Sequence, residues 1–164
     1  GGTGATVCRD RRCIVEHERG LMRDNLIASC SDEGIYINRG AQTEIIQNTL
    51  VDTAGVSVRF AESTAQLTGN LIDGPLRERD GAALRATDNR STWLVASYLR
   101  LSDVRAGFAD ALALDLRWNG QPPRRRTAAG SPDERPDLCG ARRPANPAYG
   151  AFEDLTRCAS SNRR

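Results

Sequence analysis

Short runs in which apolar and polar residues alternate recur along the first half of the chain. The runs Gly34-Ile-Tyr-Ile-Asn, Gly55-Val-Ser-Val-Arg and Gly81-Ala-Ala-Leu-Arg place apolar residues one and three positions after a glycine. A period of two is typical of a strand with one buried face. A glycine at the start of each run permits a tight corner. The pattern therefore predicts three equivalent strands, each entered from a glycine corner.

A second kind of run begins with asparagine, at Asn25, Asn48 and Asn70, which lie 23 and 22 residues apart. Each Asn shares a strand face with an apolar residue two positions later, so we expect its side chain to point inward. A buried amide must be hydrogen-bonded, and stacked Asn residues can satisfy one another in a ladder with the spacing of neighbouring strands. The alternative interpretation is that each Asn marks an exposed turn. The regular spacing favours the ladder.

Self-similarity at this period indicates a solenoid, in which each coil buries its apolar face against its neighbours. Two weaker matches extend the series: 93–99, with Ser97 in the Asn position, and 111–116, which resembles a glycine-type strand without its glycine. Residues 13–16 match the first coil. The sequence predicts an all-β solenoid of about five coils over residues 1–118, with 119–164 as a loop-rich cap of the same structural unit.

The composition changes from Asn119 onward. Residues 121–126 combine two prolines with three arginines and indicate an extended loop. The arginine run permits a nucleic-acid interpretation, but in a chain of net charge +2 a solvated loop is favoured. Residues 149–155 are predicted to form a short edge strand that could cap the solenoid.

The bulk composition fits such a repeat and limits the partners. The chain has 164 residues, of which 5% are aromatic, and its Lys and Arg positions are all arginine. A GC-rich genome would explain the absence of lysine, and so would a need for carboxylate or phosphate contacts. The weak net charge gives no support to nucleic acid or an anionic membrane as partner, and no apolar run is long enough to span a bilayer. The chain starts at Gly1, almost inside a repeat, so we expect a fragment or a mature form.

The five cysteines contain no C-x-x-C pair, which argues against a zinc ribbon. Cys8 and Cys13 flank an arginine-rich turn, and Cys139 and Cys158 flank the last strand-like segment. Two local disulfides would fit a secreted protein, with Cys30 left over. The alternative is five reduced thiols in a cytoplasm.

The Asn and Gly coils resemble the right-handed parallel β-helix repeats of pectate-lyase-like proteins. The ending resembles the C-termini of secreted bacterial members, in which an Asp-x-Cys-Gly-x-x-Arg element precedes a Gly-Ala-Phe-Glu strand. Here these are Asp137 to Arg143 and Gly150 to Glu153. The resemblance implies a right-handed β-helix on the cell surface or outside the cell. That superfamily includes lyases, hydrolases, epimerases, adhesins and phage spikes, so the resemblance does not choose a reaction. In the lyases an Arg or Lys abstracts a proton, often with calcium held by Asp or Glu.

In a solenoid, equivalent outward positions form straight columns. The expected alignment places Asn38, Arg59 and Arg85 in one column, and further candidates beside or beyond them are Glu16, Tyr36 and Asp115. Arginines in such a strip would hold the carboxylates of an acidic polysaccharide through bidentate hydrogen bonds. The alternative is an ordinary polar strand surface with structural ion pairs.

The remaining candidates have weaker signals. The only histidine, His17, lies between two glutamates and has no partner spacing typical of a triad. Acidic residues near the corners could bind calcium; these are Asp32, Glu33, Asp73, Glu78 and Asp80. The two tryptophans, Trp93 and Trp118, could stack on sugar rings or close the core. Two hypotheses remain. The first is a protein that recognises acidic polysaccharide or a surface glycan, either with or without cleaving or modifying it; calcium would be required only if it is a lyase. The second is a non-catalytic adhesin-like module.

Overall fold

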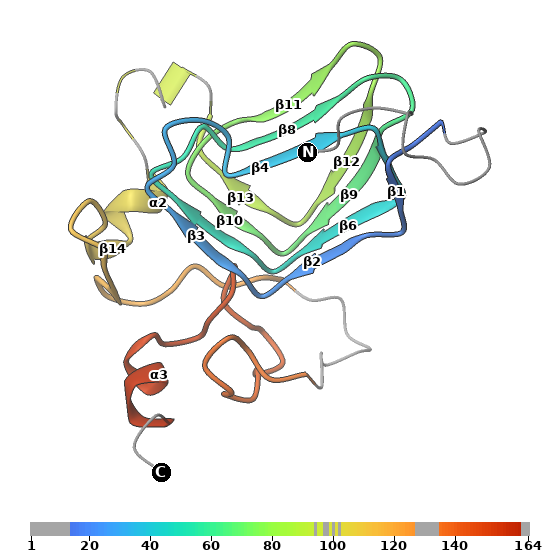
Figure 1. Cartoon of the computed structure of the whole chain (residues 1–164). Coiled ribbons are helices and arrows are strands. Elements are labelled where there is room, and N and C mark those ends of the chain that lie inside the picture. Colours follow the sequence, from blue (N-terminus) through green and yellow to red (C-terminus); the bar gives the residue numbers. More distant parts are fainter. Residues whose placement is uncertain are drawn as a thin grey trace.

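The chain folds as a parallel β-solenoid of about four turns (Figure 1). The computed structural model describes residues 14–93, 95–96, 99, 101, 103–126 and 135–161. Three parallel sheets form its walls. Sheet 1 contains β4 (Ile35–Asn38), β8 (Val56–Arg59) and β11 (Leu76–Arg79). Sheet 2 contains β2 (Leu21–Arg23), β6 (Thr43–Ile46), β9 (Thr64–Thr68) and β12 (Ala83–Thr87). Sheet 3 contains β3 (Leu26–Ala28), β7 (Thr49–Val51), β10 (Leu71–Ile72) and β13 (Arg90–Ser91).

Each coil passes from sheet 1 to sheet 2 and then to sheet 3. Strands of successive coils pair in register, as in Ile35↔Val56↔Leu76 and Leu21↔Glu44↔Gln66. A further short pair joins β1 (His17–Glu18) to β5 (Gly40–Ala41) at the corner between sheets 1 and 2. The expected fold class is therefore confirmed, with about four turns in place of five.

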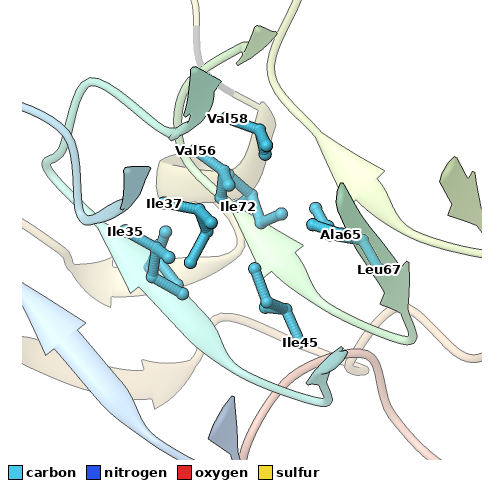
Figure 2. Close-up of a cluster of buried hydrophobic side chains, with 9 residues drawn as sticks. Ile35, Ile37, Ile45, Val56, Val58, Ala65, Leu67 and Ile72 are labelled. Atoms are coloured by element: carbon cyan, nitrogen blue, oxygen red, sulfur yellow. The ribbon is translucent and has the colours of Figure 1, made fainter. Parts of the chain in front are cut away.

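The core lies between the three sheets and is built from alternating apolar positions (Figure 2). Ile37 and Val58 come from sheet 1, Ile45 and Leu67 from sheet 2, and Ile72 from sheet 3, and each is at most 1% exposed. Small and branched aliphatic side chains fill this interior without an aromatic residue, as the composition predicted.

The Asn ladder is present and has four members. The side-chain amide and the backbone N–H of Asn25 donate to the Oδ1 of Asn48, and the same two groups of Asn48 donate to Asn70. Asn70 continues the pattern to Asn89, 19 residues later. Each Asn also donates to the carbonyl two residues before it. One oxygen acceptor and one amide donor are both needed at each step, which explains why Asn is used.

The residue before each ladder Asn turns the chain from sheet 2 to sheet 3. Asp24, Gln47, Gly69 and Asp88 all have positive φ, at 53°, 52°, 71° and 52°. This left-handed conformation is tolerated best by Gly, Asn and Asp. The four residues form a column along the outside of the corner, beside the ladder inside it.

The C-terminal part of the chain lies against this corner and against the outer face of sheet 3 (Figure 1). We call residues 135–158 the C-terminal clasp. It makes a polar contact with each coil: Arg143 pairs with Asp24, the Ala151 N–H donates to Thr49 Oγ1, the Gly150 N–H donates to the Gly69 carbonyl, and the Tyr149 hydroxyl donates to Asp88. The clasp thus runs across the coils and ties all four together from the side.

A second apolar cluster fills the space between sheet 3 and the segments that cover it. Val51 and Leu71 face outward here and pack with Phe152 of the clasp. The helix α2 (Asp103–Ala106) and the antiparallel hairpin of β14 (Phe108–Asp110) and β15 (Asp115–Trp118) complete the cluster through Val104, Phe108 and Leu116. The two central strands of sheet 3, β7 and β10, are therefore buried on both faces, whereas the outer faces of sheets 1 and 2 carry exposed side chains.

Several expectations for the C-terminal half are corrected. Residues 95 and 96, inside the expected coil strand at 93–99, are helical, and 111–116 supplies part of an antiparallel hairpin. Residues 149–155 form no strand and do not cap the end of the solenoid, because Gly150 has φ of 91° and the segment runs across the coils. A short helix, α3 (Thr156–Ser161), follows.

The Cys139–Cys158 disulfide is present and joins the first part of the clasp to its last residue, which lies in α3. Cys30 is a free thiol. The proposed Cys8–Cys13 pair and residue 13 of the expected first strand lie outside the described residues.

Candidate functional site

The outer face of sheet 1 carries two columns of polar and aromatic side chains. Tyr36, Ser57 and Arg77 occupy equivalent positions in one column, and Asn38, Arg59 and Arg79 occupy the other. Parallel strands in register stack such positions about 4.8 Å apart. Tyr36 is 41% exposed, and the Arg79 side chain is 47% exposed. The face therefore offers a row of guanidinium groups bordered by an aromatic ring.

Three of the six predicted strip residues, Tyr36, Asn38 and Arg59, lie together on this face. Arg85 does not: β12 pairs with β9, so Arg85 aligns with Gln66 on sheet 2. Its expected place beside Arg59 is taken by Arg79.

The error in the alignment of Arg85 has a physical cause. Gly81 precedes a strand of sheet 2, whereas the glycine corners at 34 and 55 precede strands of sheet 1. Both kinds of strand alternate with period two, so the pattern alone does not distinguish them. The strand that does belong to sheet 1 begins at Leu76 and has the sequence Leu-Arg-Glu-Arg, which contains one apolar residue.

The other two predicted residues lie apart from the column. The backbone N–H of Glu16 donates to the Arg39 carbonyl near the corner between sheets 1 and 2. Asp115 lies in the β14–β15 hairpin and pairs with Arg117. Neither residue extends the arginine column.

Arg59 is held in place by contacts with its neighbours. It pairs with Asp80 of the next coil, and its guanidinium lies 4.7 Å from the centre of the Phe60 ring. The hydrogen bond from Arg59 to the Asp80 carboxylate, followed by the Tyr36 hydroxyl, raises the pKa of Arg59. Arg39 lies 5.5 Å from the same ring. These contacts orient two cations around one aromatic side chain.

Arg77 and Arg79 lie near two adjacent acids, Glu33 and Asp32. Their Nη1 atoms each lie 3.9 Å from Glu33 Oε1, whose side chain is 11% exposed. Hydrogen bonding with Glu33 is the main cause that lowers the pKa of Asp32, and the two arginines add to it. Each guanidinium group has five N–H donors, so these contacts leave donors for an external anion.

Ser57 is completely buried although it points to the outer face, and its hydroxyl has no hydrogen-bond partner among the described residues. Its neighbours in the column are Tyr36 and Arg77. These long side chains cover the hydroxyl in the structure.

The remaining candidates have mainly structural contacts. His17 Nε2 lies 2.9 Å from Thr43 Oγ1, and its ring lies where a side chain at Gly40 would be. Asp73 is buried and pairs with Arg105 Nε at 3.1 Å. Glu78 points toward the interior at the last coil and accepts the Leu84 N–H at 2.6 Å.

The two tryptophans differ in their surroundings. Trp93 is 77% exposed, whereas Trp118 stacks on Phe108 with ring centres 4.6 Å apart. In the part of the chain that the structure describes, no group of three His, Cys, Asp or Glu residues is arranged to hold a metal ion. No helix among those residues is both long and apolar enough to cross a membrane.

The arginine run of the C-terminal loop has a role that composition did not predict. Arg124 pairs with Glu153 and Arg125 with Asp88, so two of its three members fasten the loop to the clasp and to the solenoid corner. Gly69 makes room for this contact, because a Cβ there would lie 2.6 Å from Arg125 Nη1.

No protein-family model, curated protein or solved structure matches the chain.

Proposed function

We propose that the protein binds acidic polysaccharide along the outer face of sheet 1. The observation that carries the proposal is the in-register column of Arg59 and Arg79, with Arg77 and the exposed Tyr36 in the adjacent column. Guanidinium groups bind carboxylates through paired hydrogen bonds, and an aromatic ring offers an apolar surface to the face of a sugar. A straight column suits a linear chain of repeated acidic units.

The side chains of Arg59, Arg77 and Arg79 are ordered by neighbouring residues before a ligand binds. Arg59 is oriented by Asp80 and Phe60, and Arg77 and Arg79 are oriented by Glu33. Side chains that are already ordered lose less entropy on binding. The resemblance to pectate-lyase-like proteins supports the same ligand class, and the Cys139–Cys158 disulfide supports an extracellular or cell-surface location.

The test is binding to polygalacturonate, with neutral dextran as the comparison polymer. We expect the parent protein to bind polygalacturonate and to lose affinity as salt is raised. The double variant Arg59→Ala/Arg79→Ala should bind at least tenfold more weakly, because each charge-assisted hydrogen bond contributes about 1.5–3 kcal/mol. The matched control is Arg85→Ala, which removes an exposed arginine from sheet 2.

Equal binding by the parent and the double variant would overturn the proposal, as would equal binding to dextran. A solenoid that serves only as a spacer would show no difference between the parent and the double variant, and none between polygalacturonate and dextran. Absorbance of unsaturated products, measured with and without calcium, shows whether a bound polymer is also cleaved.

A further inference from the structure

A cleft of about 570 Å³ lies between the end of the β14–β15 hairpin and the C-terminal clasp. This volume is in the range of sites for small organic ligands. Arg117, Trp118, Pro122, Arg124, Arg142 and Arg157 are among its lining residues. The cleft belongs to the clasp side of the molecule, and its lining shares no residue with the sheet 1 face.

The lining is cationic. Four arginines face two acids, Glu153 and Asp154. Glu153 is directed inward: its carboxylate lies 3.7 Å from Arg143 Nη1, which is fully buried, and accepts the Ala148 N–H at 2.9 Å. The acids therefore leave an excess of positive charge in the cleft.

The arginines differ in how far they are neutralised. Arg117 is paired with Asp115 through two hydrogen bonds, which are the main cause that lowers the pKa of that carboxyl group. Arg124 pairs with Glu153 and donates to the Asn146 carbonyl. The exposed guanidinium of Arg142 has no hydrogen bond or ion pair with any of the residues that the structure describes. Arg142 is the cation best placed to receive an anionic group.

An ordered apolar wall lies beside this charge. Trp118 donates from Nε1 to the Glu153 carbonyl at 2.9 Å and stacks on Phe108, so its ring is fixed. Pro122 and Pro144 add further apolar surface. Sites for small organic ligands typically combine aromatic side chains with a few polar or charged groups that fix the orientation of the ligand.

We propose that this cleft binds a sugar ring that carries an anionic group, with the carboxylate or phosphate at Arg142 and the ring against Trp118. This site is independent of the sheet 1 face. Sugar acids and sugar phosphates share the required chemistry, and the experiment below separates them.

The test uses a Trp93→Phe variant, in which Trp118 is the only remaining tryptophan. Its fluorescence is followed while galacturonate, glucose 6-phosphate or neutral glucose is added. We expect saturable changes with one or both anionic sugars and none with glucose. Adding Arg142→Ala should weaken the binding at least tenfold, whereas Arg142→Lys, which keeps the charge, should restore part of it.

Arg59→Ala in the same background is the control for the other face and should bind as the parent does. Because Arg142 is exposed, thermal unfolding should show that its variants remain folded. Absence of saturable binding by both anionic sugars would overturn the proposal, and so would unchanged binding by the Arg142→Ala variant. These results are independent of polygalacturonate binding by the sheet 1 variants, so the two proposals can fail separately.

Discussion

Arg143 lies beside Asp24, 119 residues earlier in the chain, with its Nη2 atom 2.5 Å from Oδ1 of the carboxylate. The same nitrogen also donates to the carbonyls of Gly150 and Ala151. The Arg143 side chain is completely buried, so this contact joins the clasp to the first corner of the solenoid without solvent between them. The Asp-x-Cys-Gly-x-x-Arg element thus ends in a residue that holds the fold together.

Replacement of this arginine tests its contribution. Arg143→Met keeps much of the side-chain volume but leaves Asp24 and Glu153 without their buried cation. We expect the free energy of unfolding to fall by about 3–5 kcal/mol, the usual cost of removing one member of a buried ion pair. Urea denaturation measures the change. The adjacent Arg142→Ala is the control and should change stability by about 0.5 kcal/mol or less, since its side chain is exposed.

The middle of the Asn ladder should matter more than its end. Asn48→Ala removes the acceptor for two N–H groups of Asn25 and the side-chain amide that donates to Asn70, while the backbone N–H donor to Asn70 remains. It leaves buried polar groups unsatisfied, so we expect a loss of about 3 kcal/mol in denaturant unfolding. Asn25→Ala, at the exposed end, should cost about 1 kcal/mol. Equal losses at the two positions would contradict the ladder as a source of stability.

Two glycines of the clasp separate a steric effect from backbone strain. Gly150 and Gly140 have φ of 91° and 76°. A Cβ at Gly150 would lie 2.2 Å from Thr49 Oγ1, whereas nothing lies within 4 Å of one at Gly140. Gly140→Ala should cost about 1 kcal/mol from strain alone, and Gly150→Ala about 3 kcal/mol, because the clasp must also move away from sheet 3. Thermal unfolding of the two variants checks the order, and a reversed order would refute it.

The clasp should weaken in alkaline solution through Tyr149. Burial, followed by the hydrogen bond to Asp88, raises the pKa of Tyr149 above its ordinary value of 10.0. The folded state therefore holds this proton more tightly, so the stability that it contributes is present below pH 10 and is lost as pH rises through the folded pKa. The chain contains no lysine to obscure this region.

Measured from pH 8 upward, the unfolding free energy of the parent should fall above about pH 10, at the ordinary tyrosine value. Tyr149→Phe should be less stable at pH 8, because it lacks the Asp88 hydrogen bond, and its curve should fall less steeply above that point. Parallel curves for the two proteins would show that Tyr149 does not control the alkaline change.

The sequence period predicts three of the four residues of the Asn ladder. Asn25, Asn48 and Asn70 lie 23 and 22 residues apart, and their inward direction follows from the period of a strand. Asn89 comes only 19 residues after Asn70 and was missed. The last coil is shorter because its corners are shorter, and a solenoid constrains its strands and ladder much more than the length of its corners.

The candidate site was found only in part for the same reason. Tyr36, Asn38 and Arg59 were placed together because two glycine corners happen to precede strands of one sheet. Arg77 and Arg79 follow a proline, within a polar strand, and carry no such signal. Arg77 and Arg79 lie as far before Asn89 as Tyr36 and Asn38 lie before Asn48, but only the structure identifies Asn89 as the fourth ladder residue.

The sequence by itself determined the solenoid, its alternating core and the inward Asn residues, because these depend on periods of two within a strand and on a recurrence between adjacent coils. Only the tertiary structure decided which strands share a sheet and where the C-terminal clasp lies. The pairing depends on corner lengths that hydrophobic periodicity does not encode. The clasp depends on contacts such as Arg143 with Asp24, whose partners are far apart in the chain and become neighbours only when four corners have stacked.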